Sequence, residues 1–363
     1  MSYSKGLEGV VAAETYVGHV DGENGKLIYR GYMAKDLAVN YSFEEVAYLV
    51  WNDALPNEKE LNEFKKALKE NRSIPDYVLN ILRVLPKETE IMSVLRTCIS
   101  ALGTKDYAWP PKIDQAVKLT AITPTIIAYW YRKQNNLSII NPNNELDHVA
   151  NYLYMIKGEK PREDLVKALS AYFILTIEHG MNASTFSSRV VTSTESDMVS
   201  ALCAAIGAMK GPLHGGAPSG VISMLDEISS KEEIEPWVRA RLDKGEKIMG
   251  FGHRVYRTRD PRSEALKTVL QSVASKNNWF DLVLEVEKTT IALLEEYKPG
   301  RGIYTNVEYF AAAVMKSIDL HSSLFTPTFT ASRFVGWTAH ILEQSASNRI
   351  YRPQSVYKGP VPV

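Results

Sequence analysis

Residues 210–218, KGPLHGGAP, and residues 249–262, MGFGHRVYRTRDPR, each place one histidine in a glycine-bordered turn. Glycine beside His214 and His253 lets the backbone approach a bound ligand closely. Arginines follow His253 at short spacing, and arginine is suited to bidentate binding of carboxylate or phosphate. Read alone, the second segment is equally typical of a solvated basic loop. Together the two segments predict a site for a carbonyl substrate that carries negative charge.

Helical periodicity surrounds these segments and predicts an all-α fold with a small N-terminal β element. The pairs Asp21-Gly22 and Asn24-Gly25 predict a hairpin turn within residues 1–32. Ser42 with Glu45 is a capping-box pattern, and Gly103 is a candidate C′ glycine. The expected helices cover 42–51, 57–68, 76–85, 88–102, 113–134, 145–157, 162–178, a further helical stretch to 191 after EHGMNAST, 194–210, 219–229, 231–243, 262–275, 279–297, a helix ending at 318, and a last helix from 330.

The bulk properties favour a soluble intracellular protein. The 363 residues carry 42 Lys+Arg and 42 Asp+Glu, a balance that favours neither nucleic acid nor an acidic membrane as partner. The N-terminus lacks the apolar core of a signal peptide, and no apolar run reaches the ~18 residues that span a bilayer. Two widely spaced cysteines, Cys98 and Cys203, imply no disulfide framework and therefore a reducing compartment, the cytoplasm.

Several common enzyme classes are disfavoured because their motifs are absent. The segment around Gly250 is not a G-x-G-x-x-G after a strand. The chain has no Walker A lysine, no H-E-x-x-H and no G-x-S-x-G, so we expect no metal and no nucleophile-elbow hydrolase. Of the seven histidines, His179, His214 and His253 stand out because each abuts glycine. His214 lies just before an expected helix, where spare N–H groups favour neutral imidazole, a hydrogen-bond donor to a forming enolate.

The ordered motifs of the chain resemble those of citrate synthases. They are VDGENGKLIYRG, EHGMNAST, KGPLHGGA, MGFGHRVYRTRDPR, YTNVEYF and SRFVGWTAHILEQ, and they cover nearly the whole sequence. The resemblance implies an all-α homodimer in which each subunit has a large domain, residues 1–211 and 322–363, and a small domain, residues 212–321. It implies that oxaloacetate binds first in the cleft between them and closes it, which creates the site for acetyl-CoA. No cofactor is implied, because the coenzyme A thioester is a substrate.

The resemblance also assigns roles by position. His214 matches the residue that stabilises the enol or enolate of acetyl-CoA, and His253 the one that polarises the ketone of oxaloacetate. The remaining matches to oxaloacetate contacts are His179, Arg262, Arg333 and Arg352, the last reaching across the dimer interface. The matches to the coenzyme A region are Gly250, Phe251, Gly252, Arg254, Tyr256, Lys298, Arg301 and Asn306.

One position departs from the family pattern. Most members have aspartate as the base that removes the methyl proton of acetyl-CoA, whereas this chain has Glu308 in YTNVEYF. Glutamate has similar intrinsic acidity but is one methylene longer. Misplacement of a catalytic group by an ångström is worth up to about 100-fold in rate. We therefore expect Glu308 to act as the base, with altered turnover or acyl preference.

Two rival functions fit the same motifs. A 2-methylcitrate synthase would use propionyl-CoA in place of acetyl-CoA, and the volume of the acyl pocket, which the motifs do not reveal, decides between them. A non-catalytic helical dimer that binds coenzyme A or a dicarboxylate would explain Glu308 as a sign of lost chemistry. Retention of His179, His214, His253, Arg262 and Arg333 argues against that loss.

Overall fold

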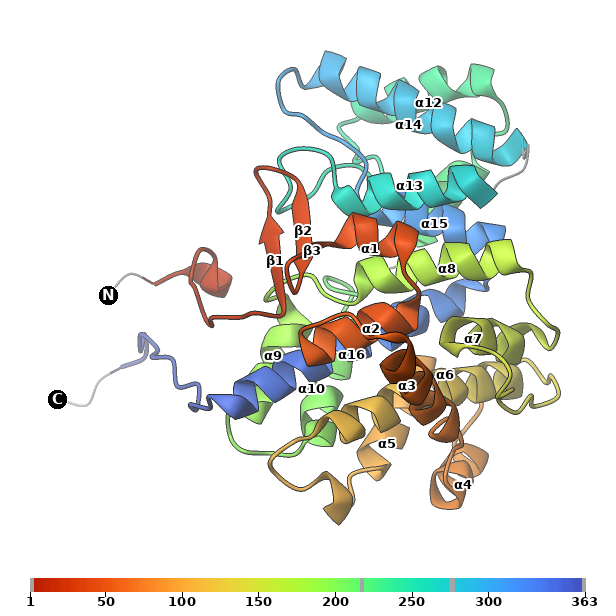
Figure 1. The fold of residues 1–363 in the computed structure, drawn as a ribbon. Coiled ribbons are helices and arrows are strands. Elements are labelled where there is room, and N and C mark those ends of the chain that lie inside the picture. Colours follow the sequence, from red (N-terminus) through yellow and green to blue (C-terminus); the bar gives the residue numbers. More distant parts are fainter. Residues whose placement is uncertain (1–2, 216–218, 274–277, 361–363) are drawn as a thin grey trace.

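The computed structural model describes residues 3–215, 219–273 and 278–360. This described chain is predominantly α-helical, as the sequence predicts (Figure 1). The helices of the first part are α1 Ala34–Asn40, α2 Phe43–Asn52, α3 Glu58–Glu70, α4 Asp76–Val84, α5 Ile91–Ala101, α6 Ile113–Gln134, α7 His148–Lys157, α8 Glu163–Thr176, α9 Ala183–Thr192 and α10 Met198–Lys210. They are followed by α11 Ser219–Asp226, α12 Lys231–Asp243, α13 Pro261–Val273, α14 Asn278–Tyr297, α15 Val307–Ser317 and α16 Phe325–Ala346.

The predicted hairpin forms a small antiparallel sheet. Strand β1 spans Gly18–Asp21 and β2 spans Lys26–Tyr29, in a register that pairs Asp21 with Lys26 across the turn. Asp21 stabilises the turn by accepting hydrogen bonds from the backbone and side chain of Asn24, at 3.0 and 2.8 Å. A short third strand, β3 Tyr32–Met33, pairs with β2 and was not predicted.

Two of the predicted helix boundaries can be compared with the structure, one at a helix start and one at a helix end. The predicted capping box is confirmed, because Ser42 Oγ accepts from Glu45 N at 3.3 Å and Glu45 Oε2 accepts from Ser42 N at 2.7 Å. Gly103 occupies the predicted C′ position, directly after the cap residue Leu102, but it does not adopt the left-handed conformation that is common there. Helix α5 ends at Ala101 with a right-handed Leu102 as its cap, and Gly103 does not have a positive φ. The end of this helix therefore does not need glycine's conformational freedom.

The last helix begins earlier than the sequence predicts. We expected a loop through Pro327, but α16 starts at Phe325, directly after the 3-10 turn Ser322–Leu324. Proline is tolerated in a first helical turn because its missing N–H would have no partner there. The extra residues matter, since Phe325, Thr326 and Phe329 face the cavity described below.

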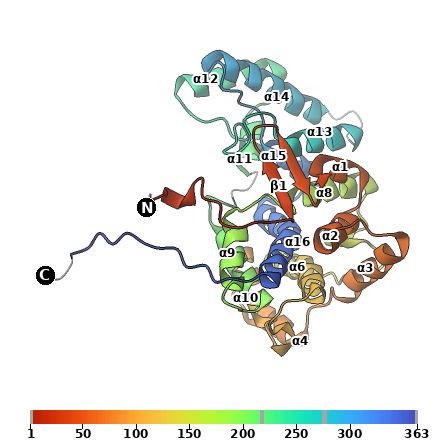
Figure 2. The ribbon, with the colours of Figure 1, turned by 60° about the vertical axis from the view of Figure 1, so that its left-hand side comes forward.

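Helix α16 is the central element of the core. It packs against α6, α8, α9 and α10, and Figures 1 and 2 show it passing through the middle of the body. Its apolar side chains Phe334, Val335, Trp337 and Ile341 are fully buried. A helix that is buried around most of its circumference needs apolar residues on several faces, which explains why a single amphipathic stripe is not visible in its sequence.

Two groups of helices meet above α16. Helices α12 and α14 pack against each other at the top of Figure 1, while α13 packs against α8, α15 and α1.

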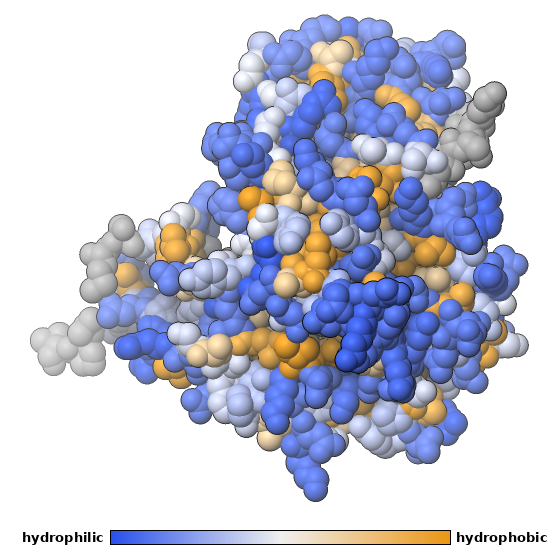
Figure 3. Space-filling model, in the orientation of Figure 1, coloured by the Kyte–Doolittle hydropathy of each residue, from blue (hydrophilic) through white to orange (hydrophobic). Residues whose placement is uncertain are grey.

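The face drawn in Figure 3 is largely hydrophilic, with apolar residues gathered mainly near its middle. None of the helices among the described residues is both long and apolar enough to cross a membrane. The first and last described segments, residues 3–17 and 347–360, extend from the same side of the body (Figure 2).

Candidate active site

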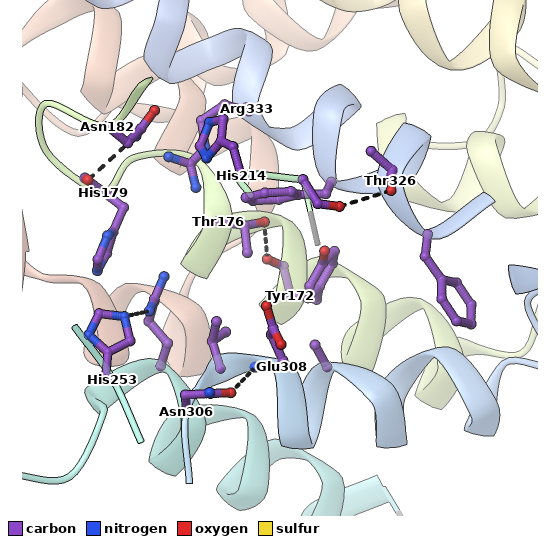
Figure 4. Close-up of a pocket in the computed structure, with 16 residues that line it drawn as sticks. Tyr172, Thr176, His179, Asn182, His214, His253, Asn306, Glu308, Thr326 and Arg333 are labelled. Atoms are coloured by element: carbon purple, nitrogen blue, oxygen red, sulfur yellow. Dashed lines mark hydrogen bonds between the residues drawn. The ribbon is translucent and has the colours of Figure 1, made fainter. Parts of the chain in front are cut away.

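A cavity of about 220 Å³ lies where α8, α15 and α16 converge (Figure 4). It brings together seven of the predicted site residues, which are distant in sequence. The cavity is lined by Tyr172, Thr176, His179, Asn182, His214, Gly215, His253, Arg262, Asn306, Val307, Glu308, Ala311, Phe325, Thr326, Phe329 and Arg333. Residues 216–218 of the first glycine-bordered segment lie outside the described residues.

His179 lies in the short loop between α8 and α9. Gly180, with a φ of +64°, turns the chain there, and Asn182 caps α9 by accepting from Thr185 N at 3.1 Å. The imidazole Nε2 is 3.2 Å from the hydroxyl of Tyr256. Burial, followed by the nearby Arg262 guanidinium, lowers the pKa of His179 well below its usual value. The ring is therefore neutral near pH 7.

His214 follows α10 and is held by a serine. Its Nε2 lies 2.6 Å from Ser184 Oγ, and that oxygen also accepts from Trp337 Nε1 at 3.0 Å. The Ser184 hydroxyl has one proton and two possible acceptors, His214 Nε2 and Asn182 Oδ1, the second of which lies 2.8 Å away. When the proton goes to His214, the neutral ring donates from Nδ1. Burial, reinforced by the charge of Arg333, lowers the pKa of His214 to about 4, so the ring is uncharged at neutral pH.

The tautomer of His253 follows from its hydrogen bonds. Its Nδ1 accepts from the backbone N–H groups of Val255 and Tyr256, both at 3.0 Å. Burial, followed by the Arg262 guanidinium, lowers the pKa of His253 to about 4, so the neutral ring carries its proton on Nε2. Arg262 Nη2, also a donor, lies 3.2 Å from this Nε2. Two converging donors fit an oxygen acceptor such as a carbonyl or carboxylate of a ligand.

Arg262 is anchored by a buried aspartate. Asp260 accepts from Arg262 Nε at 3.0 Å and from Nη2 at 2.8 Å, and both side chains are almost completely buried. The same carboxylate accepts from the backbone N–H of Val307 at 3.0 Å. Asp260 therefore connects the arginine to the start of α15, which carries Glu308.

Arg333 is buried on α16 without a full set of partners. It is 2% exposed, and its Nε and Nη1 have no hydrogen-bond partner among the described residues. Its guanidinium carbon lies 4.8 Å from the centre of the Phe329 ring. A buried cationic group with unsatisfied donors is costly for the folded protein. Because Arg333 lines the cavity, an anionic ligand there would supply the missing acceptors.

Glu308 lies in the first turn of α15, opposite His214 in Figure 4. Asn306 caps this helix by accepting from Glu308 N at 3.0 Å, and its Nδ2 donates to Gly252 O at 2.9 Å. Burial raises the pKa of Glu308 above its ordinary value, and Arg262 opposes part of this rise. A half-buried carboxylate with a raised pKa is a stronger proton acceptor than an exposed one.

A second cavity, of about 420 Å³, adjoins the first and shares His253 with it. The predicted coenzyme A residues Phe251, Gly252, Arg254, Tyr256, Lys298 and Arg301 line it, together with Lys247 and Arg257, which the sequence analysis did not select. Gly250 and Asn306 belong to its support, because Asn306 N donates to Gly250 O at 2.9 Å. These basic side chains face a cavity without a lining carboxylate among the described residues, which suits a phosphorylated ligand.

Arg352 is separate from both cavities. It lies exposed in the extended segment that follows α16, and the structure does not bring it to the other predicted residues of its own chain.

The described residues contain no group of three or more His, Cys, Asp or Glu side chains able to hold a metal ion.

The sequence does not reveal several residues that line the cavity or, in the case of Ser184, hold a residue that lines it. Tyr172 and Thr176 lie four apart on α8 and thus on one face of that helix, but the pattern around them is that of a buried core helix. Thr326 and Phe329 were missed because α16 was expected to begin later. Ser184 stands inside the EHGMNAST motif, where its position in the first turn of α9 was the available signal.

A family model and individual relatives both show the same protein family. The family model described as "Citrate synthase, C-terminal domain" matches residues 6–354. Citrate synthase 2 of Bacillus subtilis is 40% identical and the alignment covers 99% of this chain and 97% of that protein. A 2-methylcitrate synthase of Mycobacterium tuberculosis is also 40% identical, with 98% and 90% covered.

A solved structure extends this likeness to the fold. The solved structure of citrate synthase from Thermoplasma acidophilum, in a ternary complex with carboxymethyl coenzyme A and oxaloacetate, is similar to this chain with a TM-score of 0.89 and 34% sequence identity. The comparison covers 100% of this chain and 97% of that one. The chain belongs to the citrate synthase family of acyltransferases.

Proposed function

We propose that this protein condenses acetyl-CoA with oxaloacetate to give citrate and coenzyme A. The observation that carries the proposal is the composition of the first cavity. It combines neutral histidines, two buried arginines and a carboxylate with a raised pKa within about 220 Å³. These are the groups needed to bind a keto dicarboxylate and to remove a proton from a neighbouring thioester.

Oxaloacetate would bind between the two arginines. Arg333 would supply its unsatisfied Nε and Nη1 to one carboxylate, and Arg262, held by Asp260, would contact the other. His253 would donate from Nε2 to the ketone oxygen and make its carbon more electrophilic. His179, 5.6 Å from His253 between ring centres, would complete the contacts. Neutral imidazoles suit this role because they donate without adding further positive charge.

Formation of the carbon nucleophile requires two groups to act together. The α-proton of a thioester is much less acidic than a carboxylic acid, so Glu308 alone cannot remove it quickly. His214 would stabilise the enolate oxygen as the negative charge develops. The enolate carbon then attacks the ketone carbon polarised by His253. Hydrolysis of the resulting citryl thioester releases coenzyme A and citrate.

The second cavity would hold the phosphates of coenzyme A. Arg254, Lys298 and Arg301 are the predicted contacts, and Lys247 and Arg257 add charge beside them. The thioester would enter the first cavity along the wall that both cavities share at His253. The solved complex of the T. acidophilum protein with a coenzyme A analogue and oxaloacetate supports this arrangement by similarity. No separate cofactor is needed, since coenzyme A enters as part of the substrate.

We further propose a cytoplasmic homodimer with a large domain, residues 1–211 and 322–363, and a small domain, residues 212–321. The free thiols of Cys98 and Cys203 support a reducing compartment. Helix α10 supports close packing of a second subunit, because the small residues Ala204 and Gly207 lie on its partly exposed side. In such a dimer Arg352, exposed in the extended tail, would reach the partner's oxaloacetate site.

Propionyl-CoA is the second candidate for the acyl substrate. The M. tuberculosis 2-methylcitrate synthase is as similar in sequence as the B. subtilis citrate synthase, which favours propionyl-CoA as a second candidate substrate. One assay separates the possibilities. Purified protein receives oxaloacetate with acetyl-CoA or propionyl-CoA, and free thiol is followed over time. Faster release with acetyl-CoA supports the proposal, faster release with propionyl-CoA supports a 2-methylcitrate synthase, and no release with either supports a non-catalytic binding protein.

A further inference from the structure

The N-terminal hairpin contacts the chain on both sides of the keto-acid site. At its base, the hydroxyl of Tyr29 donates to the backbone carbonyl of Glu178 at 3.0 Å in a buried position. A Cβ added to Gly18 would come within 2.7 Å of Glu178 Cγ. On the other side of His179, a Cβ on Gly180 would meet Val20 at 3.3 Å. The residues that flank His179 are thus packed directly against β1 and β2.

The turn of the same hairpin contacts the loop that carries His253. The carbonyl of Gly22 accepts from Arg257 N at 2.9 Å. A Cβ at Gly22 would lie 2.3 Å from the carbonyl oxygen of Val255, a distance that real Cβ atoms do not adopt. Gly25, with a φ of +61°, would place a Cβ 2.9 Å from the carbonyl oxygen of Arg259. The turn therefore approaches the loop so closely that only glycine fits.

The contacted part of the loop is also the part that orients His253. The backbone N–H of Val255 is one of the two that donate to His253 Nδ1. The other is that of Tyr256, whose ring lies 4.8 Å from that of His253 and 5.6 Å from that of His179. A shift of the loop backbone would change the direction of the Nε2–H donor.

We propose that the β1–β2 hairpin is a strut that sets the separation and orientation of His179 and His253. Its base is held by the residues that flank His179, and its turn holds the backbone next to His253. Figure 1 shows the hairpin rising from the body toward the loops below α12 and α14. Gly22 and Gly25 are positioning residues in this account, because they act through the loop and do not touch the substrate. The roles of the two histidines rest on the proposed function above.

The test compares glycine-to-alanine variants at the turn with a matched control. Gly22→Ala and Gly25→Ala introduce a Cβ into the contact. Gly31→Ala is the control, because Gly31 has a φ of +86° in the turn that joins β2 to β3 and a Cβ there meets nothing within 4 Å. Gly25→Ala and Gly31→Ala therefore share backbone strain and differ in the contact with the loop. Gly25→Ala also keeps the test informative when Gly22→Ala does not fold.

Two measurements are made on folded protein. Limited trypsin digestion reports cleavage after the exposed Arg254, Arg257 and Arg259, identified by fragment mass. We expect both turn variants to be cleaved there about fivefold faster or more than the control, since loss of a closed contact raises the open population. We also expect kcat/KM for oxaloacetate to fall about tenfold or more, as for ångström-scale misplacement of a catalytic group.

The outcomes distinguish this inference from the proposed function. Turn variants that match Gly31→Ala in cleavage rate would overturn the strut, whether or not the protein is catalytically active. Faster cleavage with unchanged kcat/KM in an active enzyme would also overturn it, because the hairpin would then hold the loop without positioning His253. When the wild-type protein releases no thiol, the proposed function fails and the digestion still decides whether the turn holds the loop.

Discussion

Replacing Arg333 with methionine separates its cost to the fold from its contribution to binding. The guanidinium is buried with Nε and Nη1 unsatisfied, and each unsatisfied buried donor costs about 1–3 kcal/mol. Methionine removes that cost and also removes the contact with the Phe329 ring, worth about 0.5–2 kcal/mol, and the electrostatic attraction between Arg333 and the buried Glu178. We therefore expect the ligand-free Arg333→Met protein to unfold at the wild-type temperature or above it.

Binding of oxaloacetate should respond in the opposite direction. Loss of one partner of a buried charged hydrogen bond costs about 2–5 kcal/mol, equivalent to a Kd at least about 30-fold higher. At a concentration 100 times the wild-type Kd, oxaloacetate stabilises the wild-type protein by about 2.7 kcal/mol. The same concentration should stabilise Arg333→Met by less than about 1 kcal/mol.

Thermal unfolding with and without oxaloacetate measures both effects. An unfolding entropy of about 2.1 cal/mol/K per residue over 363 residues makes 1 kcal/mol worth about 1.3 °C. The wild-type Tm should then rise by about 3–4 °C with oxaloacetate, and that of Arg333→Met by about 1 °C or less. An equal rise in both proteins would refute the assignment of Arg333 to the dicarboxylate.

Arg189 is the matched control for this experiment. It is also buried, but it donates to Gln344 at 3.1 Å, to His340 at 2.9 Å and to Glu343 at 2.6 Å. Removing a fully paired buried charge costs about 3–5 kcal/mol. Arg189→Met should therefore lower the ligand-free Tm by about 4–6 °C. If both variants lost the same stability, the contrast between paired and unpaired arginines would be wrong.

Three further predictions concern the chemistry of the two cavities. Ser184→Ala should lower kcat for thiol release about tenfold or more, because His214 loses the group that fixes its ring; an unchanged kcat in a folded variant would contradict this role. The acid limb of kcat/KM should lie above pH 4.5, since burial raises the pKa of Glu308 above that ordinary value while His214 gains a proton only near pH 4. Activity then falls as pH decreases through the pKa of Glu308, and a limb at pH 4 would point to the histidine instead. Arg301→Gln should raise KM for acetyl-CoA about tenfold and leave the Kd of oxaloacetate unchanged; equal effects on both ligands would place Arg301 elsewhere.

The sequence predicts those parts of the site that have a local signature. His179, His214 and His253 were found because glycine adjoins each of them, and their convergence in one cavity agrees with that choice. The helices follow from periodicity and caps, as at Ser42. Tyr172 carries no such signature, because a residue that faces a cavity from a buried helix has the same apolar neighbours as a residue of the core.

Interactions between distant segments are also hidden in the sequence. The contact of Ser184 with His214 joins α9 to the segment after α10, and the contact of Gly22 with Arg257 joins the hairpin to a loop more than 200 residues later. Both depend on the packing of whole elements. The spacing of Asn24 and Gly25 predicts a turn, but it does not reveal what that turn contacts.

Thiol release by Glu308→Gln tests the central claim most directly. Glutamine keeps the size and hydrogen-bonding capacity of the side chain but cannot accept the methyl proton. With oxaloacetate and acetyl-CoA at saturation, we predict that its rate falls about 10²–10⁴-fold, while oxaloacetate still stabilises the variant against heat. Glu308→Asp should retain or exceed the wild-type rate. Undiminished thiol release by Glu308→Gln would contradict the assignment of Glu308 as the base and, with it, the proposed mechanism.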